Sequence, residues 1–356
     1  MANDLRAAFE HACRLAIDRQ ADVVLAPGDL FDYETAGPDT AEFISRTLAG
    51  LAPIPVFIAP GNHDSLRPRS PYFDEWPENV HIFTSPEFES RPVAGMDCSI
   101  TGIAHAHRGI TERLLAQPIP APQSRTRILL FHGSRDGFRP SYKENVLPFS
   151  DAELLAQDFT YCAIGHYHSY AEITDEKGIR AAYSGCTQGR GLDETGEKWA
   201  LVGEIDAEGR VTLERVEVAQ RRIVRVEVDA TGARDSADLF ARIDESLRQR
   251  ARTQDAVYVF LRGLLPAGIE IDTAAWASRQ AYFSATLSTS GAEPDYDLDA
   301  ICRESAASPL RSAFVANMRE RQAAAVDDEE RRILRDATYY GLFALDRRPL
   351  EPRDVD

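Results

Sequence analysis

The stretch that decides the fold spans residues 23–32 and reads Val-Val-Leu-Ala-Pro-Gly-Asp-Leu-Phe-Asp. Its first four residues are apolar, which predicts a short buried strand over 23–26. The Gly28-Asp29 pair that follows places a flexible turn and a carboxylate directly after that strand. Because ligand sites in open α/β sheets lie at the carboxyl ends of strands, this segment predicts an α/β fold with a functional site at the strand ends.

The same pattern recurs through the first 220 residues, where short apolar runs alternate with polar loops. Strands are expected at 23–26, 56–59, 100–103, 128–131, 161–164, 181–183 and 199–205, and helices at 5–19 and 40–51. Helices between buried strands indicate layered α/β packing. Five glycine-containing motifs lie at or just after these strand ends: Gly28-Asp29-Leu30-Phe31-Asp32, Gly61-Asn62-His63-Asp64, Phe131-His132-Gly133, Gly165-His166-Tyr167-His168 and Tyr183-Ser184-Gly185-Cys186.

The side chains of these motifs form a mixed set of nitrogen and oxygen ligands: one carboxylate, one amide oxygen and several imidazoles. Such a set suits Mn²⁺, Fe²⁺ or Zn²⁺ better than Ca²⁺. Two ions about 3.5–4 Å apart can clamp a phosphate and generate a hydroxide nucleophile, and Asp29 is the candidate bridging ligand. Any one motif alone is more often turn chemistry, but all of them in this order indicate a metal site.

Other reactive residue types carry weaker signals. His105 and His107 form a His-x-His without a strand-terminal glycine, so we interpret them as loop residues, and His11 and His81 as ordinary ones. Cys186 has no evident partner base and is interpreted as a small half-buried residue. The five cysteines form no Cys-x-x-Cys pair, which favours reduced thiols in a cytoplasmic protein. No apolar run is long enough to span a membrane.

The net charge of −17 at first argues against a nucleic-acid partner. Its distribution weakens that argument, because residues 221–356 hold 20 Arg, no Lys and 24 acidic residues, a net of only −4. An acidic body also suits a site that binds divalent cations, since the ions supply the positive charge that meets phosphate. Charge alone therefore excludes neither DNA nor a small phosphorylated substrate.

A second domain is expected after about residue 220. Val224, Val226 and Val228 alternate with charged residues and predict a half-buried strand, and Ser236 is a candidate cap for the helix that follows. Further strands are expected at 257–261 and 283–287, then a loop through Gly-Ala-Glu-Pro-Asp-Tyr-Asp and helices to about Leu345. We therefore divide the chain into domains at 1–220 and 221–290 and a helical region at 291–356, with the last ten residues frayed.

In their order and residue types, the motifs resemble those of the calcineurin-like metallophosphoesterase superfamily, and most closely its DNA repair exonuclease (SbcD/Mre11-like) branch. The segment from Tyr183 to Lys198 resembles a bacterial subgroup of that branch. The resemblance implies a four-layer α/β/β/α sandwich with a smaller C-terminal α/β cap that binds DNA. It also implies a Mn²⁺-dependent DNA exonuclease or endonuclease with two divalent ions, a Rad50- or SMC-like coiled-coil ATPase as partner, and often a homodimer.

Position by position, the resemblance makes Asp29 the ligand shared by both ions. Asn62, His132 and His166 complete one ion site, and His168 binds the other ion. His63 then protonates the leaving oxygen, and Asp64 orients His63. We expect Arg190 to contact substrate.

One departure from the family pattern affects the second ion. No Asp-x-His motif precedes Asp29, and the chain opens in what the sequence predicts to be the first helix. We expect that the native start lies upstream, that a sheet position is unfilled, and that the second ion site keeps only Asp29 and His168. Two alternatives therefore stay open: a phosphodiesterase for a small nucleotide, and a catalytically impaired binding module on the same scaffold.

Overall fold

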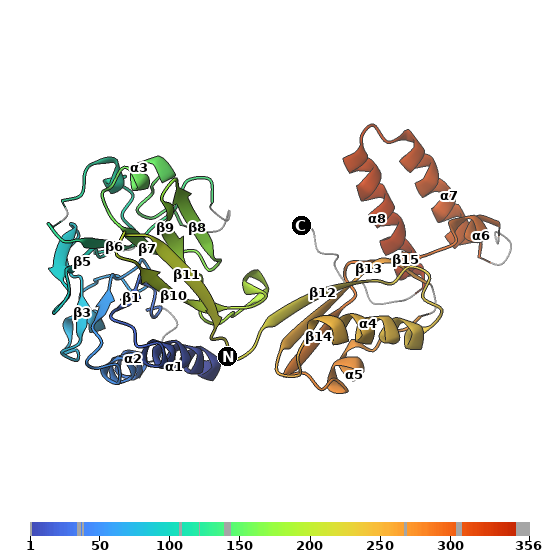
Figure 1. Cartoon of the computed structure of the whole chain (residues 1–356). Coiled ribbons are helices and arrows are strands. Elements are labelled where there is room, and N and C mark those ends of the chain that lie inside the picture. The colour runs from blue at the N-terminus through green and yellow to red at the C-terminus, as the bar shows by residue number, and fades with distance from the viewer. Residues whose placement is uncertain are drawn as a thin grey trace. The chain divides into compact units, whose positions relative to one another are not determined.

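The computed structural model describes residues 2–33, 37, 39–106, 109–120, 122–138, 144–266, 269–303 and 308–346 (Figure 1). The chain divides into two compact units, Met1–Arg222 and Ile223–Asp356. All eight residues that the sequence marks as site candidates belong to the first unit. The last ten residues, expected to be frayed, lie outside the described part of the chain.

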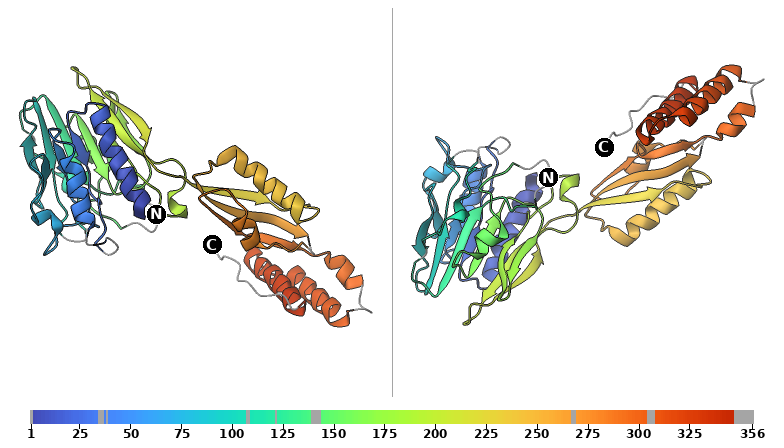
Figure 2. Two further views of the ribbon diagram at one scale, coloured as in Figure 1. Left: turned by 90° about the horizontal axis from the view of Figure 1, so that it is seen from below. Right: turned by 90° about the horizontal axis from the view of Figure 1, so that it is seen from above.

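One face of the first unit is built from helices on a small parallel sheet. The strands β1 (Val24–Ala26), β2 (Val56–Ile58) and β3 (Val80–Ile82) pair in that order. The helices α1 (Ala2–Asp18) and α2 (Thr40–Ala49) run side by side over this sheet (Figure 2). Apolar residues of the helices and strands meet in one cluster; they include Cys13, Phe43, Ile44, Leu48, Val56, Ile58, Val80 and Ile82.

A six-stranded sheet forms the second layer of strands, in the order β4-β5-β6-β7-β9-β8. Its four inner strands are parallel, and its two outer strands, β4 and β8, pair antiparallel. The parallel arrangement brings the carboxyl ends of β6 and β7 together, where His132 and Gly165 are paired in register. The strands are β4 (Glu89–Pro92), β5 (Cys98–Gly102), β6 (Thr126–His132), β7 (Tyr161–Gly165), β8 (Ala171–Asp175) and β9 (Gly178–Tyr183).

The two sheets pack face to face through a cluster that includes Phe57, Ile100 and Leu130. The outer face of the larger sheet buries a second cluster under α3 (Asp151–Leu155) and loops. The layers of the first unit are therefore helices, the smaller sheet, the larger sheet, and a short helix with loops. This order confirms the expected α/β sandwich. Short 3-10 helices occur at η1 (Pro71–Phe73), η2 (Leu114–Ala116) and η3 (Leu192–Glu194).

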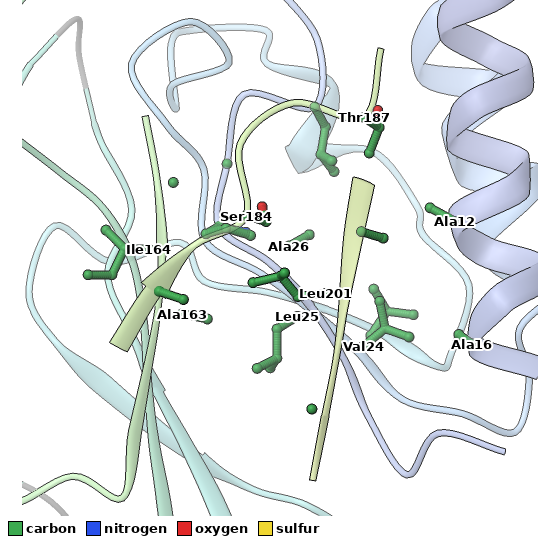
Figure 3. A pocket seen from close by; sticks show the side chains of 18 of the residues that line it. Ala12, Ala16, Val24, Leu25, Ala26, Ala163, Ile164, Ser184, Thr187 and Leu201 are labelled. Atoms are coloured by element: carbon green, nitrogen blue, oxygen red, sulfur yellow. The ribbon is translucent and has the colours of Figure 1, made fainter. Parts of the chain in front are cut away.

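A large cavity lies beside β1 (Figure 3). Within the described residues, β1 pairs only with β2, and β10 (Trp199–Ile205) pairs only with β11 (Val211–Glu217). The cavity has a volume of about 2050 Å³ and is lined by apolar side chains of α1, β1, β7 and β10, among them Ala16, Leu25, Ala163 and Leu201. Among the described residues, the open edge of β1 thus lies beside an apolar cavity.

The second unit is built on the parallel strands β12 (Ile223–Asp229), β13 (Ala256–Pro266) and β14 (Ser284–Ser288). The helices α4 (Ser236–Arg250) and α5 (Thr273–Ser278) accompany them. Leu239, Ile243 and Leu247 of α4 are buried, as their four-residue spacing predicts.

Two details of the second unit differ from the sequence predictions. The residue that caps α4 is Asp235, whose carboxylate accepts from the Asp238 amide, and Ser236 is already helical. The segment expected as a loop contains β15 (Ala292–Asp295), which pairs with the far end of β13. β15 pairs with an eleven-residue strand that is distant in the sequence, so the residues around β15 do not by themselves predict a strand there.

The helical region comprises α6 (Leu298–Arg303), α7 (Pro309–Ala324) and α8 (Asp328–Leu345). Val315 and Leu342 are fully buried between these helices and form a small cluster with Ile301. In the described part of the chain, no helix is long and apolar enough to cross a bilayer.

Candidate metal centre

The ends of four strands supply the residues of the site. Asp29 follows β1, Asn62 follows β2, His132 ends β6, and His166 follows β7. Two glycines allow the loops to approach closely. Gly28 has φ +84, and a Cβ there would lie 2.5 Å from the Gly61 amide nitrogen; a Cβ on Gly61 would overlap Asp29 Oδ1. The glycines of the motifs thus bring the first two loops into contact.

Four atoms with lone pairs converge at one point of the site. His132 Nε2 lies 3.0 Å from Asn62 Oδ1, 3.3 Å from Asp29 Oδ2 and 3.2 Å from His166 Nδ1. Asn62, His132 and His166 are 1%, 0% and 5% exposed, so water does not satisfy these atoms. Acceptors that face one another in a buried site repel unless a cation or a proton lies between them. The arrangement therefore fits a bound divalent cation.

Backbone carbonyls orient both imidazoles. His132 Nδ1 lies 2.9 Å from the carbonyl oxygen of Pro27, and His166 Nε2 lies 3.0 Å from that of Glu144. A carbonyl only accepts, so each of these nitrogens carries the hydrogen, and the opposite ring nitrogen presents its lone pair to the centre. Metal-binding histidines are commonly held in this way. The Asn62 amide is oriented likewise, because its Nδ2 donates to Glu144 Oε2 over 3.3 Å and its Oδ1 faces inward.

Two residues of the site have backbone conformations that residues other than glycine rarely adopt. Asp29 has φ +54 and His166 has φ +114. Such conformations are unfavourable for residues with a Cβ and persist where the surroundings enforce them. They lie at two of the metal-ligand candidates, where the loop must turn to direct the side chain inward.

The electrostatics of the site point to the same centre. Burial raises the pKa of Asp29, but the charge of His132 and its hydrogen bond outweigh burial and hold that pKa well below its usual range. Burial lowers the pKa of His132, and the charge and hydrogen bond of Asp29 outweigh it and leave the pKa raised. Asp29 thus stays ionised, and a positive charge between the two side chains is stabilised, whether it is a proton on His132 Nε2 or a cation that takes the place of that proton.

A candidate ligand set for one ion is present among the described residues. One ligand atom from each of Asp29, His132 and His166 lies within 4.8 Å of the others, and Asn62 Oδ1 joins them. His168 does not belong to this group within the described chain. Two oxygen and two imidazole ligands suit Mn²⁺, Fe²⁺ or Zn²⁺. The structure thus brings together four of the five expected ligands.

His63 lies at the edge of the centre and is 38% exposed at its side chain. Its backbone amide donates to Asp29 Oδ1 over 3.0 Å, while its Nδ1 lies 3.3 Å from Asp32 Oδ2. The imidazole therefore faces a carboxylate that ends the first glycine motif and that was not expected to act in the site. The sequence signal for Asp32 is its place in the Gly28–Asp32 motif, three residues after the ligand candidate Asp29.

The carboxylate of Asp64 has a different partner from the one expected. Rather than orienting His63, it accepts from the amides of Gly61 and Leu30, over 2.6 and 2.8 Å, and from the Tyr72 hydroxyl over 2.6 Å. Asp64 is fully buried, and burial together with the charge of Asp29 raises its pKa to about 6. Asp64 thus joins the first two motif loops to each other, because its position on the turn directs it into the core.

His168 has a carboxylate neighbour that sequence reasoning missed. His168 Nδ1 lies 2.5 Å from Oε1 of Glu194, which is 3% exposed on η3. Arg190, the expected substrate contact, also binds Glu194, through its backbone amide over 2.8 Å and its guanidinium over 3.1 Å. Burial raises the pKa of Glu194, but the hydrogen bonds from His168 and Arg190 outweigh it and lower that pKa to about 2.

Of the remaining histidines and cysteines, His105 and Cys186 bear on the site. His105 lies in the loop after β5, as expected, and is fully buried there, with its Nε2 2.8 Å from the backbone oxygen of His132. His107 lies outside the described residues. Burial raises the pKa of Cys186 to about 11, which leaves its thiol protonated at neutral pH.

Comparisons with known proteins place this geometry in a family. Residues 2–170 match the family model of the calcineurin-like phosphoesterases. The chain is 28% identical over 268 residues to the uncharacterized metallophosphoesterase YhaO of Bacillus subtilis, covering 73% of this chain and 64% of the relative. It is also similar to the DNA double-strand break repair protein Mre11 of Thermoplasma acidophilum (28% identity; 64% of this chain, 63% of the relative) and of Saccharolobus solfataricus (26%; 51% and 48%).

In each case the match spans less than two thirds of the relative's length. The matched region includes the strands that carry Asp29, Asn62, His132 and His166. These residues converge on a site suited to a divalent cation, as a phosphoesterase of this kind requires. Residues 2–170 thus form a calcineurin-like phosphoesterase domain.

Proposed function

We propose that this chain is a metal-dependent phosphodiesterase that cleaves DNA, with Mn²⁺ as its working ion. The observation that carries the proposal is the convergence of Asp29, Asn62, His132 and His166 on one point, with the His63–Asp32 pair beside it. DNA is favoured as substrate because two relatives are named as DNA double-strand break repair proteins.

The ligands divide into two groups. Asp29, Asn62, His132 and His166 would hold one ion, and Asp29 would share the second ion with His168. When bound, divalent ions neutralise phosphate charge and allow water to act as a nucleophile at neutral pH. Pro27 and Glu144 contribute through their carbonyl oxygens, which keep the ring lone pairs of His132 and His166 directed inward.

His63 is proposed as the group that protonates the leaving oxygen. Its Nδ1 faces Asp32, so a hydrogen on that nitrogen is stabilised and Nε2 is the atom that exchanges a proton with substrate. Its half-exposed position at the edge of the centre suits contact with a phosphodiester. General acid catalysis of this type contributes a factor of about 10²–10⁴ in rate.

DNA contacts are proposed for Arg190 and for the second unit. Arg190 lines the same cavity as Asp29, His63 and His168. In the second unit, Arg248 is exposed on the last turn of α4, and Arg250 and Arg252 follow it. Arginines of this kind bind phosphate groups without reading the base sequence. The second unit would thus supply affinity, and the first unit the chemistry.

A partner is proposed for the helical region, as the resemblance implies a Rad50- or SMC-like coiled-coil ATPase. On α8, Leu334 and Leu342 are buried within the unit, whereas Ile333 is 56% exposed. Packing against its own unit thus accounts for part of the apolar surface, and the exposed part is what a partner would cover. A homodimer and a cytoplasmic location belong to the same proposal.

The test compares substrates under identical conditions. Linear duplex DNA and bis(p-nitrophenyl) phosphate are each incubated with the chain and Mn²⁺, and His63→Ala serves as the inactive control. We expect Mn²⁺-dependent DNA cleavage that His63→Ala abolishes. Cleavage of the small diester without cleavage of DNA would favour the small-nucleotide alternative, and cleavage of neither by a metal-loaded chain would favour a binding module.

A further inference from the structure

Glu194 is a buried carboxylate to which the proposed mechanism gives no role. It lies on η3, its side chain is 2% exposed, and it contacts His168 and Arg190. A carboxylate is rarely buried without partners, because leaving water disfavours the charged form. The contacts that keep Glu194 ionised therefore indicate what it does for the two residues around it.

The two carboxylate oxygens have different neighbours. Oε2 accepts from the Arg190 backbone amide over 2.8 Å. Oε1 faces His168 Nδ1 at 2.5 Å and accepts from the Arg190 guanidinium over 3.1 Å. An ionised carboxylate only accepts hydrogen bonds. The hydrogen between Glu194 and His168 must therefore lie on Nδ1 of the imidazole.

We propose that Glu194 is a positioning residue for His168: it fixes the hydrogen on Nδ1 and thereby makes Nε2 the metal-binding atom. The proposal rests on the proposed role of His168 as a ligand. It parallels the other two histidines of the site, which backbone carbonyls hold in one tautomer. His168 differs because its acceptor is the side chain of Glu194 rather than a backbone carbonyl.

A purely structural role for Glu194 makes a different prediction. Arg190 alone gives the buried carboxylate a charge partner and closes the 190–194 loop. The backbone of His168 is held separately, since its carbonyl oxygen accepts from the Cys186 amide over 3.3 Å. If Glu194 only closed its loop, the tautomer of His168 would not depend on it.

The experiment reads that tautomer directly. The ring nitrogens of ¹⁵N-histidine-labelled, metal-free protein are recorded by two-dimensional NMR at pH 8.5, where a free imidazole is neutral. The His168 signals are assigned by their loss in His168→Asn. Four forms are compared: the unsubstituted chain, Glu194→Met, Glu194→Gln, and Asp193→Asn, which removes the exposed carboxylate next in sequence.

We expect His168 to carry its hydrogen on Nδ1 in the unsubstituted chain and in Asp193→Asn. Glu194→Gln keeps an acceptor oxygen and should keep that tautomer, whereas Glu194→Met should shift the ring toward the Nε2–H form. A hydrogen on Nε2 in the unsubstituted chain would overturn the proposal even if no variant folded. So would an unchanged ring in Glu194→Met. Neither metal nor DNA is present, so failure here is distinct from failure of the proposed function.

Discussion

His166 and His168 lie two residues apart, yet their surroundings differ sharply. His166 points into a cluster of lone-pair atoms from three other strand ends. His168 faces a carboxylate on a neighbouring 3-10 helix. The candidate centre is therefore uneven: four ligand candidates are in contact around His166, whereas the proposed second ion would have only His168 and the aspartate that it would share.

The first ion site should lose its Mn²⁺ binding when His132, its central ligand candidate, is removed. His132→Ala deletes the imidazole that contacts Asn62, Asp29 and His166, so tight Mn²⁺ binding should weaken more than about 100-fold and activity should vanish with it. Isothermal titration with Mn²⁺ measures the change. His81→Ala, on the strand β3 and outside the ligand group, is the matched control. Unchanged Mn²⁺ affinity in a folded His132→Ala protein would exclude this centre.

His63 should separate chemistry from metal binding. His63→Ala is expected to keep the Mn²⁺ stoichiometry and lose a factor of about 10²–10⁴ in cleavage rate, because its imidazole faces Asp32 at the edge of the centre. Metal analysis and single-turnover rates on the same sample test both parts.

Asp32→Asn sharpens the assignment of His63. It should cost less than His63→Ala, since the imidazole remains and only its orienting charge is lost. If His63→Ala lost its metal together with its activity, His63 would be a ligand and the assignment would be wrong.

Substitutions in the second unit should change the affinity for DNA by a smaller amount. Replacing Arg248, Arg250 and Arg252 with Gln should weaken duplex DNA binding several-fold and reduce the slope of log K against log salt by up to about 0.9 for each lost phosphate contact. Fluorescence anisotropy at several salt concentrations gives the slope. Arg331, Arg332 and Arg335 on α8, replaced in the same way, serve as the control. An identical slope in both triple variants would remove α4 from the DNA-binding surface.

Substitution of Cys186 should have the smallest effect on the rate of DNA cleavage. Burial raises the pKa of its thiol to about 11, so the nucleophilic thiolate is scarce at neutral pH. Cys186→Ser is therefore expected to cleave DNA at close to the unsubstituted rate, measured under the same Mn²⁺ conditions. A loss as large as that of His63→Ala would give Cys186 a role that its surroundings do not indicate.

The convergence of four ligand candidates could be predicted from the sequence because each lies at or just after the end of a short apolar strand, within a local motif. Their supporting groups could not. Glu194 contacts His168 across 26 residues, and nothing local distinguishes it from the exposed Asp193 beside it. The Pro27 and Glu144 contacts use backbone carbonyls, which carry no sequence signal.

Among the strands, those with clear apolar runs were predicted to within a few residues, and several edge strands were missed. β4 (Glu89–Pro92) is polar, and β8 (Ala171–Asp175) pairs at the margin of the sheet. Asp64 shows the same limit at the level of one side chain. Its place beside His63 suggested a shared role, but the turn directs it into the core toward Tyr72.

The most direct test of the central claim is the metal content of the purified chain. The chain is loaded with Mn²⁺, dialysed against metal-free buffer and analysed by mass spectrometry beside His132→Ala. About one tightly held ion per chain, lost in His132→Ala, is the predicted result, because one complete ligand set is present among the described residues. No retained ion in the unsubstituted chain, or the same content in both proteins, would contradict the account.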